Sequence, residues 1–231
     1  MKINIKRESV VEYEVDIAGG TLLEALNKIK STQDPSLSYS SGCRSSVCGS
    51  CAMRVNKREV LACSYHVKEG DLIEPLRNTL VLRDLVVDMD KAYAFNEKAK
   101  AWQSLLSEDI SLSIENQHIN ELQSDCILCG SCYSACPVYA VNSEFLGPFS
   151  LTRVWRYVSD KRESNPKEKI ETIQTNGVWD CTLCNECTLV CPQRISSKAD
   201  IEKLRAKSSM FGYMDPSFGN FGGFNDGSPV F

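Results

Sequence analysis

Apolar and polar residues alternate in short stretches over the first ninety positions, which is the pattern of half-buried strands. Residues 2–8 (KINIKRE) and 13–17 (YEVDI) show the alternation most clearly. Further short strands are expected at residues 52–55, 59–63 and 71–76. These stretches together predict a small sheet.

One segment within this region follows helical spacing instead. Residues 21–30 (TLLEALNKIK) place their leucines and isoleucine on one face of a helix, and Thr21 is a suitable N-cap. From about residue 90 the alternation stops, and residues 90–110 and 170–180 consist largely of helix formers. The chain therefore reads as an α+β domain followed by a helical domain.

Composition and charge argue against two classes of binding partner. The 231 residues are 42% hydrophobic and carry a formal net charge of -4. No dense basic cluster is present, so neither nucleic acid nor an anionic membrane surface is an expected partner. No run of about 18 apolar residues and no signal-peptide pattern occurs, which predicts a cytoplasmic location.

The chain contains twelve cysteines, and these determine the chemistry that is expected of it. Cytosolic thiols stay reduced, so dense cysteine clusters in such a chain indicate metal binding rather than disulfides. The two histidines, His66 and His118, lie outside the cysteine runs, which leaves little for mixed Cys/His zinc sites or haem.

The first cysteine group has the C-x4-C-x2-C…C spacing of plant-type [2Fe–2S] ligation. Its members are Cys43, Cys48, Cys51 and Cys63. Gly42 and Gly49 allow the backbone to pass close to the inorganic sulfurs. A zinc ribbon would show two C-x2-C pairs, so this spacing fits zinc poorly.

Two further runs, DCILCGSCYSACPV and DCTLCNECTLVCPQ, repeat the C-x2-C-x2-C-x3-C-P spacing of bacterial two-cluster ferredoxins. In that motif three thiolates bind one cubane and the fourth crosses to the other cluster. The expected ligands of cluster two are Cys126, Cys129, Cys132 and Cys191, and those of cluster three are Cys136, Cys181, Cys184 and Cys187.

Three clusters with no catalytic His/Ser/Asp constellation, phosphate loop or flavin fingerprint indicate an electron relay. The favoured interpretation is an electron-transfer subunit within a flavin-containing oxidoreductase complex. Two alternatives are a free-standing soluble polyferredoxin carrier and a structural zinc protein.

The order of these motifs over residues 1–208 resembles the iron–sulfur subunit of succinate dehydrogenase and fumarate reductase. The resemblance implies a β-grasp [2Fe–2S] ferredoxin-like domain over residues 1–92 and an α-helical ferredoxin domain over 93–208. It also implies a FAD-containing flavoprotein partner that interconverts succinate and fumarate. On the other side it implies a membrane-anchor subunit, which would make the complex peripheral on the cytoplasmic membrane and link it to quinone.

One departure from the common members of that family concerns the third cluster. Those members have an apolar residue where this chain has Cys184, and their third cluster is [3Fe–4S]. A fourth thiolate predicts two [4Fe–4S] clusters here in addition to the [2Fe–2S] cluster.

Other departures concern the quinone and the first loop. Ala140-Val141 and Thr182 occupy positions where common members carry an aromatic pair and a histidine near the quinone, so quinone contact is expected to be indirect. With Cys184, this resembles the atypical branch whose anchor carries CCG domains. Ser45 and Ser46 replace an acidic residue and a glycine, which should alter the potential of the first cluster.

Residues 209–231 form a glycine-rich tail. Its five phenylalanines are Phe211, Phe218, Phe221, Phe224 and Phe231. Two interpretations stay open: a tail disordered in isolation, or one that folds onto a partner subunit.

Overall fold

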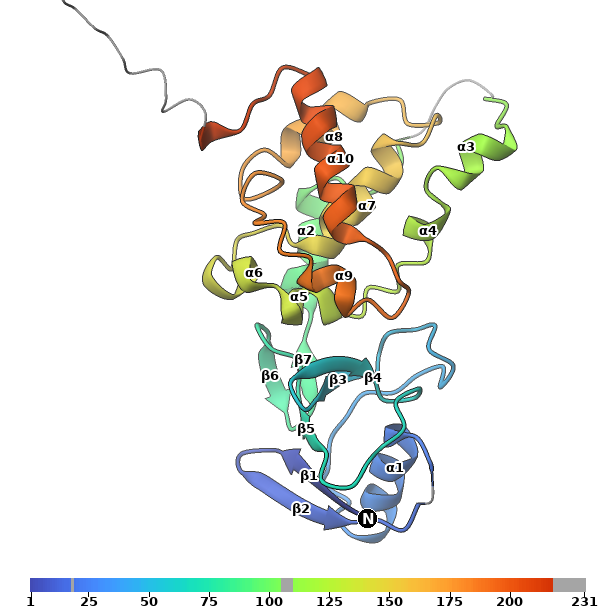
Figure 1. Ribbon diagram of the computed structural model, residues 1–231, viewed down its shortest axis with the longest axis vertical. Coiled ribbons are helices and arrows are strands. Elements are labelled where there is room, and N and C mark those ends of the chain that lie inside the picture. The colour runs from blue at the N-terminus through green and yellow to red at the C-terminus, as the bar shows by residue number, and fades with distance from the viewer. Residues whose placement is uncertain (18, 105–109, 218–231) are drawn as a thin grey trace, which may run out of the picture.

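A computed structural model describes residues 1–17, 19–104 and 110–217 of the chain. The first part is built around a sheet and the second consists of helices, and β7 leads directly into α2 where the two parts meet (Figure 1). The N-terminus lies at the far end of the sheet part. No helix in the described ranges is long and apolar enough to cross a membrane.

Five strands form the sheet, in the order β2-β1-β5-β3-β4. They are β1 (Lys2–Lys6), β2 (Val10–Glu14), β3 (Ala52–Val55), β4 (Arg58–Leu61) and β5 (Leu72–Glu74). β1 pairs antiparallel with β2 and parallel with β5, and β3 pairs antiparallel with both β4 and β5. With α1 (Leu22–Thr32) on one face, this is the expected α+β arrangement.

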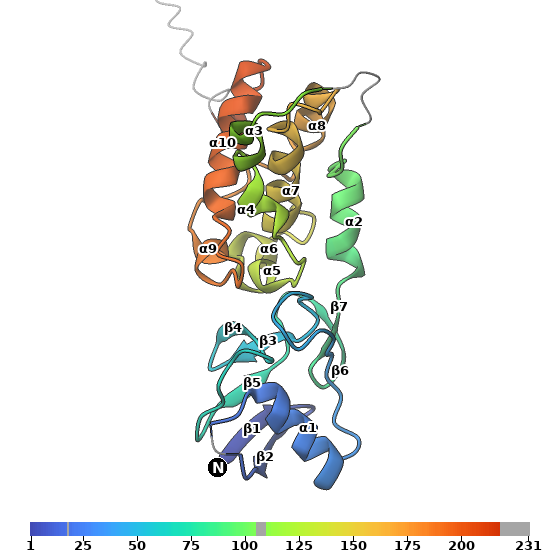
Figure 2. The same cartoon turned by 90° about the vertical axis from the view of Figure 1, so that its right-hand side faces the viewer.

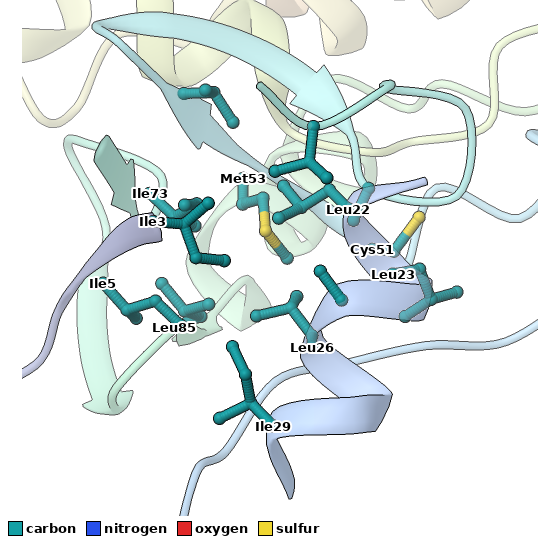
Figure 3. Packing of buried hydrophobic residues seen from close by; sticks show 14 of the residues in the cluster. Ile3, Ile5, Leu22, Leu23, Leu26, Ile29, Cys51, Met53, Ile73 and Leu85 are labelled. Atoms are coloured by element: carbon teal, nitrogen blue, oxygen red, sulfur yellow. The ribbon is translucent and has the colours of Figure 1, made fainter. Parts of the chain in front are cut away.

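Helix α1 begins where the sequence predicts. Thr21 accepts a hydrogen bond from the Glu24 amide, and the Glu24 side chain accepts one from the Thr21 amide, which closes a capping box. Leu22, Leu26 and Ile29 point from α1 toward the residues of the sheet (Figure 3). Because these side chains are fully buried, the helix is held mainly by this apolar face.

Two details of the sheet differ from expectation. The second strand runs over Val10–Glu14 rather than 13–17, because the short turn before it pairs Lys6 with Val10 and thereby fixes the register. The hairpin of β6 (Leu80–Arg83) and β7 (Val86–Asp88) was not predicted. Its strand β6 is exposed along its whole length, so the apolar/polar alternation that marks a half-buried strand is missing there.

The helical part contains α2 (Asp90–Lys98), α3 (Ile114–His118), α4 (Glu121–Ser124), α5 (Ser131–Ala135), α6 (Pro137–Val141), α7 (Pro148–Val158), α8 (Pro166–Thr172), α9 (Glu186–Leu189) and α10 (Ser197–Met210). Helices α7 and α10 lie side by side, and α2 runs along one flank of the bundle (Figures 1 and 2). The two segments expected to be helical are only partly so, because α2 ends at Lys98 and α8 at Thr172.

A second core holds the helices together around Tyr133, which is fully buried. Its ring packs edge-on against Tyr139 and Phe149, with ring centroids 4.8 and 4.5 Å apart. Phe211 of the C-terminal tail packs against this core, whereas Phe218, Phe221, Phe224 and Phe231 lie outside the described residues.

Polar contacts join the two parts at α5. The Ser134 hydroxyl donates to Glu59 of β4 at 2.7 Å and accepts from the Arg77 amide at 2.9 Å. The Asn78 amide group donates to the carbonyls of Tyr133, Ser134 and Cys136 at 3.0 to 3.3 Å. Asn78 thus adds a side-chain donor to the carbonyls at the C-terminal end of α5. The sheet part therefore fixes the position of α5.

Replacing Gly147 by alanine should destabilise the helical part. Gly147 has φ +81°, and an added Cβ would lie 2.1 Å from a carbon of the Tyr133 ring. A fully buried ring cannot move without repacking, so we expect a loss of about 1–3 kcal/mol beyond the cost of the positive φ. Gly212→Ala is the control, because Gly212 has φ +86° with nothing near its Cβ position. Equal thermal midpoints for the two variants would contradict this packing.

Candidate metal centres

The first centre is a loop between α1 and β3, and Cys63 follows β4. Within it, the Cys43 sulfur accepts from the amides of Ser45 and Val47 at 3.3 and 3.4 Å, and the Cys48 sulfur accepts from the Cys43 amide at 3.3 Å. Amides that converge on sulfur stabilise thiolates. The sequence of this loop thus provides both the ligands and the donors for an anionic cluster.

Ser46 lies at the centre of this loop with φ +61°. Its hydroxyl is 3.5 Å from the Cys63 sulfur, and its carbonyl accepts from the Gln193 side chain at 2.9 Å. Burial is the largest single influence on the pKa of Cys63, and it raises that pKa. Hydrogen bonds with Ser46 and Cys51 together have a greater effect in the opposite direction, so the pKa of Cys63 is lowered. Ser46 therefore supports the charged form of Cys63.

Two cavities in the helical part are each lined by four cysteines. One is lined by Cys126, Cys129, Cys132 and Cys191, and the other by Cys136, Cys181, Cys184 and Cys187. Their empty volumes, which include the openings to solvent, are about 380 and 300 Å³. Each cavity takes three cysteines from one run and the fourth from the other run.

The two runs fold in the same way. Leu128 and Gly130 have φ of +53° and +81°, and Leu183 and Asn185 at the matching positions have φ of +55° and +73°. A short helix lies within each run, α5 in the first run and α9 in the second. Left-handed residues on both sides of the second cysteine turn the chain around the cavity. The repeated spacing thus gives a repeated backbone.

The crossing cysteines are also alike. The Cys136 sulfur accepts from the Tyr139 amide at 3.4 Å, and the Cys191 sulfur accepts from the Ile195 amide at 3.4 Å. In both cases proline follows the cysteine, and Pro137 opens helix α6. Each crossing sulfur thus receives one amide donor from the chain just beyond its proline.

Buried sulfurs dominate the electrostatics of the cavities. Burial raises the pKa of Cys126 to about 11 and that of Cys187 to about 12, and it raises the pKa of Cys132 well above the usual value. By themselves these groups would stay protonated at neutral pH. A bound metal reverses this preference, so its binding would release protons.

The residues around the first cavity fit an iron–sulfur cluster. Thr152 lines this cavity, is fully buried, and its hydroxyl has no hydrogen-bond partner within the described residues. An acceptor that occupied the cavity would give this hydroxyl a hydrogen-bond partner. In residues 1–17, 19–104 and 110–217, no group of three or more His, Cys, Asp or Glu side chains is placed to hold a single metal ion. The four sulfurs that line each cavity instead surround one shared space.

The first loop reaches the first cavity directly. A Cβ added to Gly49 would lie 2.8 Å from Cβ of Cys129 and 2.9 Å from the carbonyl oxygen of Ile127. Only glycine permits this approach, so the loop backbone touches a residue that lines the cavity. The Gln193 contact to Ser46 closes the same interface from the second cysteine run.

Some supporting residues carry no signal in the sequence. Arg205 of α10 donates to the carbonyls of Val178, Trp179 and Cys181 at 2.8, 3.2 and 2.6 Å, which holds the chain that enters the second run. Thr152 of α7 likewise belongs to no motif. Both residues reach their centres only through helix packing.

One of the three positions linked to quinone lies beside the second cavity. Thr182 lines this cavity and is exposed, and Ala140 and Val141 are exposed at the end of α6. Val141 is 88% exposed. These side chains offer neither an imidazole nor an indole hydrogen-bonding group.

Comparison with known families supports the fold class. The family described as "2Fe-2S iron-sulfur cluster binding domain" matches residues 2–94, and the family described as "4Fe-4S dicluster domain" matches residues 122–195. Both descriptions name iron–sulfur clusters, as the cysteine spacing indicated, rather than zinc. The expected order of a [2Fe–2S] ferredoxin domain and a helical ferredoxin domain is confirmed. Boundaries at residues 92 and 208 remain predictions.

The chain is similar to curated proteins over most of its length. It is 37% identical over 207 residues to the fumarate reductase iron-sulfur subunit of Escherichia coli, covering 85% of both chains. It is 38% identical over 205 residues to the 8-methylmenaquinol:fumarate reductase iron-sulfur subunit of Wolinella succinogenes. That match covers 82% of this chain but only 64% of the relative.

One solved structure shares the fold over nearly the whole chain. A chain of the Mycobacterium smegmatis Sdh1 complex in the apo form superposes with a TM-score of 0.81 at 23% identity, covering 93% of this chain and 98% of that one. The shared fold therefore includes both the sheet part and the helical part.

Replacing Ser46 by alanine should make the first cluster harder to reduce. The hydroxyl contact to Cys63 favours negative charge, so its loss should lower the midpoint potential by an amount on the order of tens of millivolts. Redox titration followed by EPR measures this potential. Ser45→Ala is the matched control, because the Ser45 hydroxyl donates to the Cys43 carbonyl and not to sulfur. A potential unchanged by Ser46→Ala would refute the assigned role.

Proposed function

Because the chain belongs to the family of iron–sulfur subunits of fumarate reductase and succinate dehydrogenase, we propose that it relays electrons through three clusters. The proposed ligands are Cys43, Cys48, Cys51 and Cys63 for [2Fe–2S]; Cys126, Cys129, Cys132 and Cys191 for cluster two; and Cys136, Cys181, Cys184 and Cys187 for cluster three. The clusters supply the one-electron chemistry, and the chain positions them.

The observation that carries this proposal is the composition of the two cavities. Each is lined by four cysteines in which the last cysteine of one run joins the first three of the other. This exchange is what two-cluster ferredoxin motifs require. Four thiolates around one cavity provide one ligand for each of the four irons of a cubane.

The order of the relay follows from the contacts between centres. Gly49 of the first loop lies against Cys129, and this contact supports an arrangement with cluster one next to cluster two. Clusters two and three share α5, which connects Cys132 to Cys136, and α9, which connects Cys187 to Cys191. The two helices pack against each other. Electrons therefore pass from one to two to three, or in reverse.

The ends of the relay are the surfaces for partners. Cys43 and Cys184 are the two cysteines that are exposed. We assign the Cys43 end to a FAD-containing flavoprotein that interconverts succinate and fumarate, and the Cys184 end to an anchor subunit at the membrane. The relatives' names support this assignment, since both are fumarate reductase subunits.

Cluster three is proposed to be [4Fe–4S]. Cys184 lines the second cavity, so a fourth thiolate is present for the iron that otherwise has no protein ligand. Thr182, Ala140 and Val141 provide neither an imidazole nor an indole N–H for a quinone headgroup. An anchor that accepts electrons itself, of the CCG-domain kind, therefore suits this end better than direct contact with quinone.

Anaerobic purification of the native assembly tests the proposed function. We expect a flavoprotein to copurify, succinate or fumarate turnover, and EPR signals of a [2Fe–2S] cluster and of two further clusters. A species of about 26 kDa alone, with iron bound and activity toward several unrelated oxidoreductases, would instead support a free-standing polyferredoxin. A colourless preparation without iron and sulfide would overturn both.

Replacing Cys184 by serine should convert cluster three from [4Fe–4S] to a three-iron form. Removing one thiolate leaves one iron weakly held, and that iron is lost first. Iron analysis should show about one iron fewer per chain, and EPR should show a new signal of the oxidised three-iron cluster. Thr182→Ser, in the same loop, should leave the clusters unchanged. Identical cluster content in Cys184→Ser and the parent would refute the ligand assignment.

A further inference from the structure

Three helices bring polar side chains together beside the cavity assigned to cluster two. Thr152 lies on α7, Asp200 on α10 and Gln123 on α4. Their exposed fractions are 0%, 1% and 6%, so water does not solvate the group. Thr152 also lines the cavity that contains Cys126 and Cys191. The three side chains thus form a buried path that ends at this cavity.

Two atoms on this path are unpaired. The Gln123 amide group donates to Oδ1 of Asp200 at 2.8 Å. In the described part of the chain, neither Oδ2 of Asp200 nor Oγ1 of Thr152 has a hydrogen-bond partner. The Thr152 hydroxyl is nevertheless close enough to Asp200 to lower the pKa of the carboxyl group. Two adjacent orphaned polar atoms in one buried place call for a shared explanation.

The surroundings of Asp200 favour its neutral form. Burial is the largest influence and raises the pKa, while Gln123, Lys203 and Thr152 act in the opposite direction with less effect. Lys203, on the same helix, is a cation that acts on this carboxyl group, and its Nζ lies 3.8 Å from Oδ1. The neighbouring groups from α4 and α7, Gln123 and Thr152, are uncharged. A cluster bound in the cavity would carry negative charge, which would also disfavour a carboxylate at Asp200.

We propose that Asp200 and Thr152 form a hydrogen-bond relay that tunes cluster two, in which Asp200 donates to Thr152 and Thr152 donates to a sulfur of the cluster. Asp200 is a positioning residue, because it acts through Thr152 and does not reach the cluster. The inference rests on the cluster-two ligands proposed above.

The relay depends on the Thr152 hydroxyl having one hydrogen, which can be donated to only one acceptor at a time. When Asp200 is protonated, its acid proton points to Oγ1 of Thr152, and the hydroxyl hydrogen is free to point into the cavity. When Asp200 is ionised, the carboxylate is the stronger acceptor and draws that hydrogen away from the cluster. When Asp200 is protonated, no proton is transferred between the residues. Asp200 donates to Thr152, and Thr152 donates to the cluster.

A donor that points at sulfur stabilises the reduced cluster, which carries one more negative charge. The midpoint potential of cluster two should therefore be higher when Asp200 is protonated. It should fall as the pH rises through the pKa of Asp200, because the carboxylate then adds negative charge and withdraws the donor. Reduction of cluster two and protonation of Asp200 thus favour each other.

EPR-monitored redox titration of the holoprotein at several pH values tests the relay. The variants are Thr152→Val, which keeps the shape and removes the hydroxyl, Thr152→Ser, which keeps the hydroxyl, and Asp200→Asn. We expect Thr152→Val to lower the potential of cluster two and Thr152→Ser to preserve it. Asp200→Asn keeps a donor toward Thr152 at every pH, so its potential should stay near the low-pH value of the parent and lose the pH dependence.

The controls separate this inference from the proposed function. Asp215→Asn removes an exposed carboxylate of the helical part and should leave the potential and its pH dependence unchanged. If the parent shows a [4Fe–4S] signal whose potential is the same in Thr152→Val, or equally pH-dependent in Asp200→Asn, the relay is overturned and the ligand assignment stands. If no such cluster is present in the parent, the proposed function and the relay fail together.

Discussion

Four sulfur atoms surround each cavity of the helical part, and one of the four always belongs to the other cysteine run. This exchange ties together segments that are about fifty residues apart in the chain. It requires α5 and α9 to pack against each other, and it forces the intervening α7 and α8 to close on the same core. The positions of the helices are therefore set by the cavities as much as by the apolar residues.

Burial makes the thiolate form of these sulfurs unfavourable when no metal is bound. Burial raises the pKa of several thiols, because a lone thiolate in an apolar cavity has no countercharge. Iron supplies that charge, so cluster binding and completion of the helical core are coupled. The first loop is different for Cys43 and Cys48, whose sulfurs lie nearer the surface and accept backbone amides that support the anionic form. Cys51 behaves like the cavity cysteines, because burial raises its pKa to about 11.

The two parts are joined by contacts that also bring the centres together. Gly49 rests against Cys129, Gln193 holds Ser46, and Asn78 caps the end of α5. Each of these contacts involves a cysteine or a residue within three positions of one. Domain packing and the geometry of the proposed relay therefore depend on the same interactions, and a shift between the parts would lengthen the proposed step between clusters one and two.

The sequence alone determined the fold class, helix α1 with its cap and the grouping of the cysteines, because these depend on residues close together in the chain. Cysteine spacing fixes which sulfurs a turn can present, and Thr21 caps a helix through neighbours three residues away. Local pattern failed where pairing or packing decided: the register of β2, the exposed hairpin of β6 and β7, and the early end of α8.

Only the tertiary structure decided which residues complete the centres. Thr152 and Arg205 resemble any other residues of an amphipathic helix, and their roles exist because α7 and α10 pack beside the cysteine runs. Asp200 reads in the sequence as an ordinary acidic residue in the first turn of a helix, yet packing leaves it 1% exposed beside a cluster cavity. Burial, which no local pattern encodes, changes the chemistry of that carboxyl group.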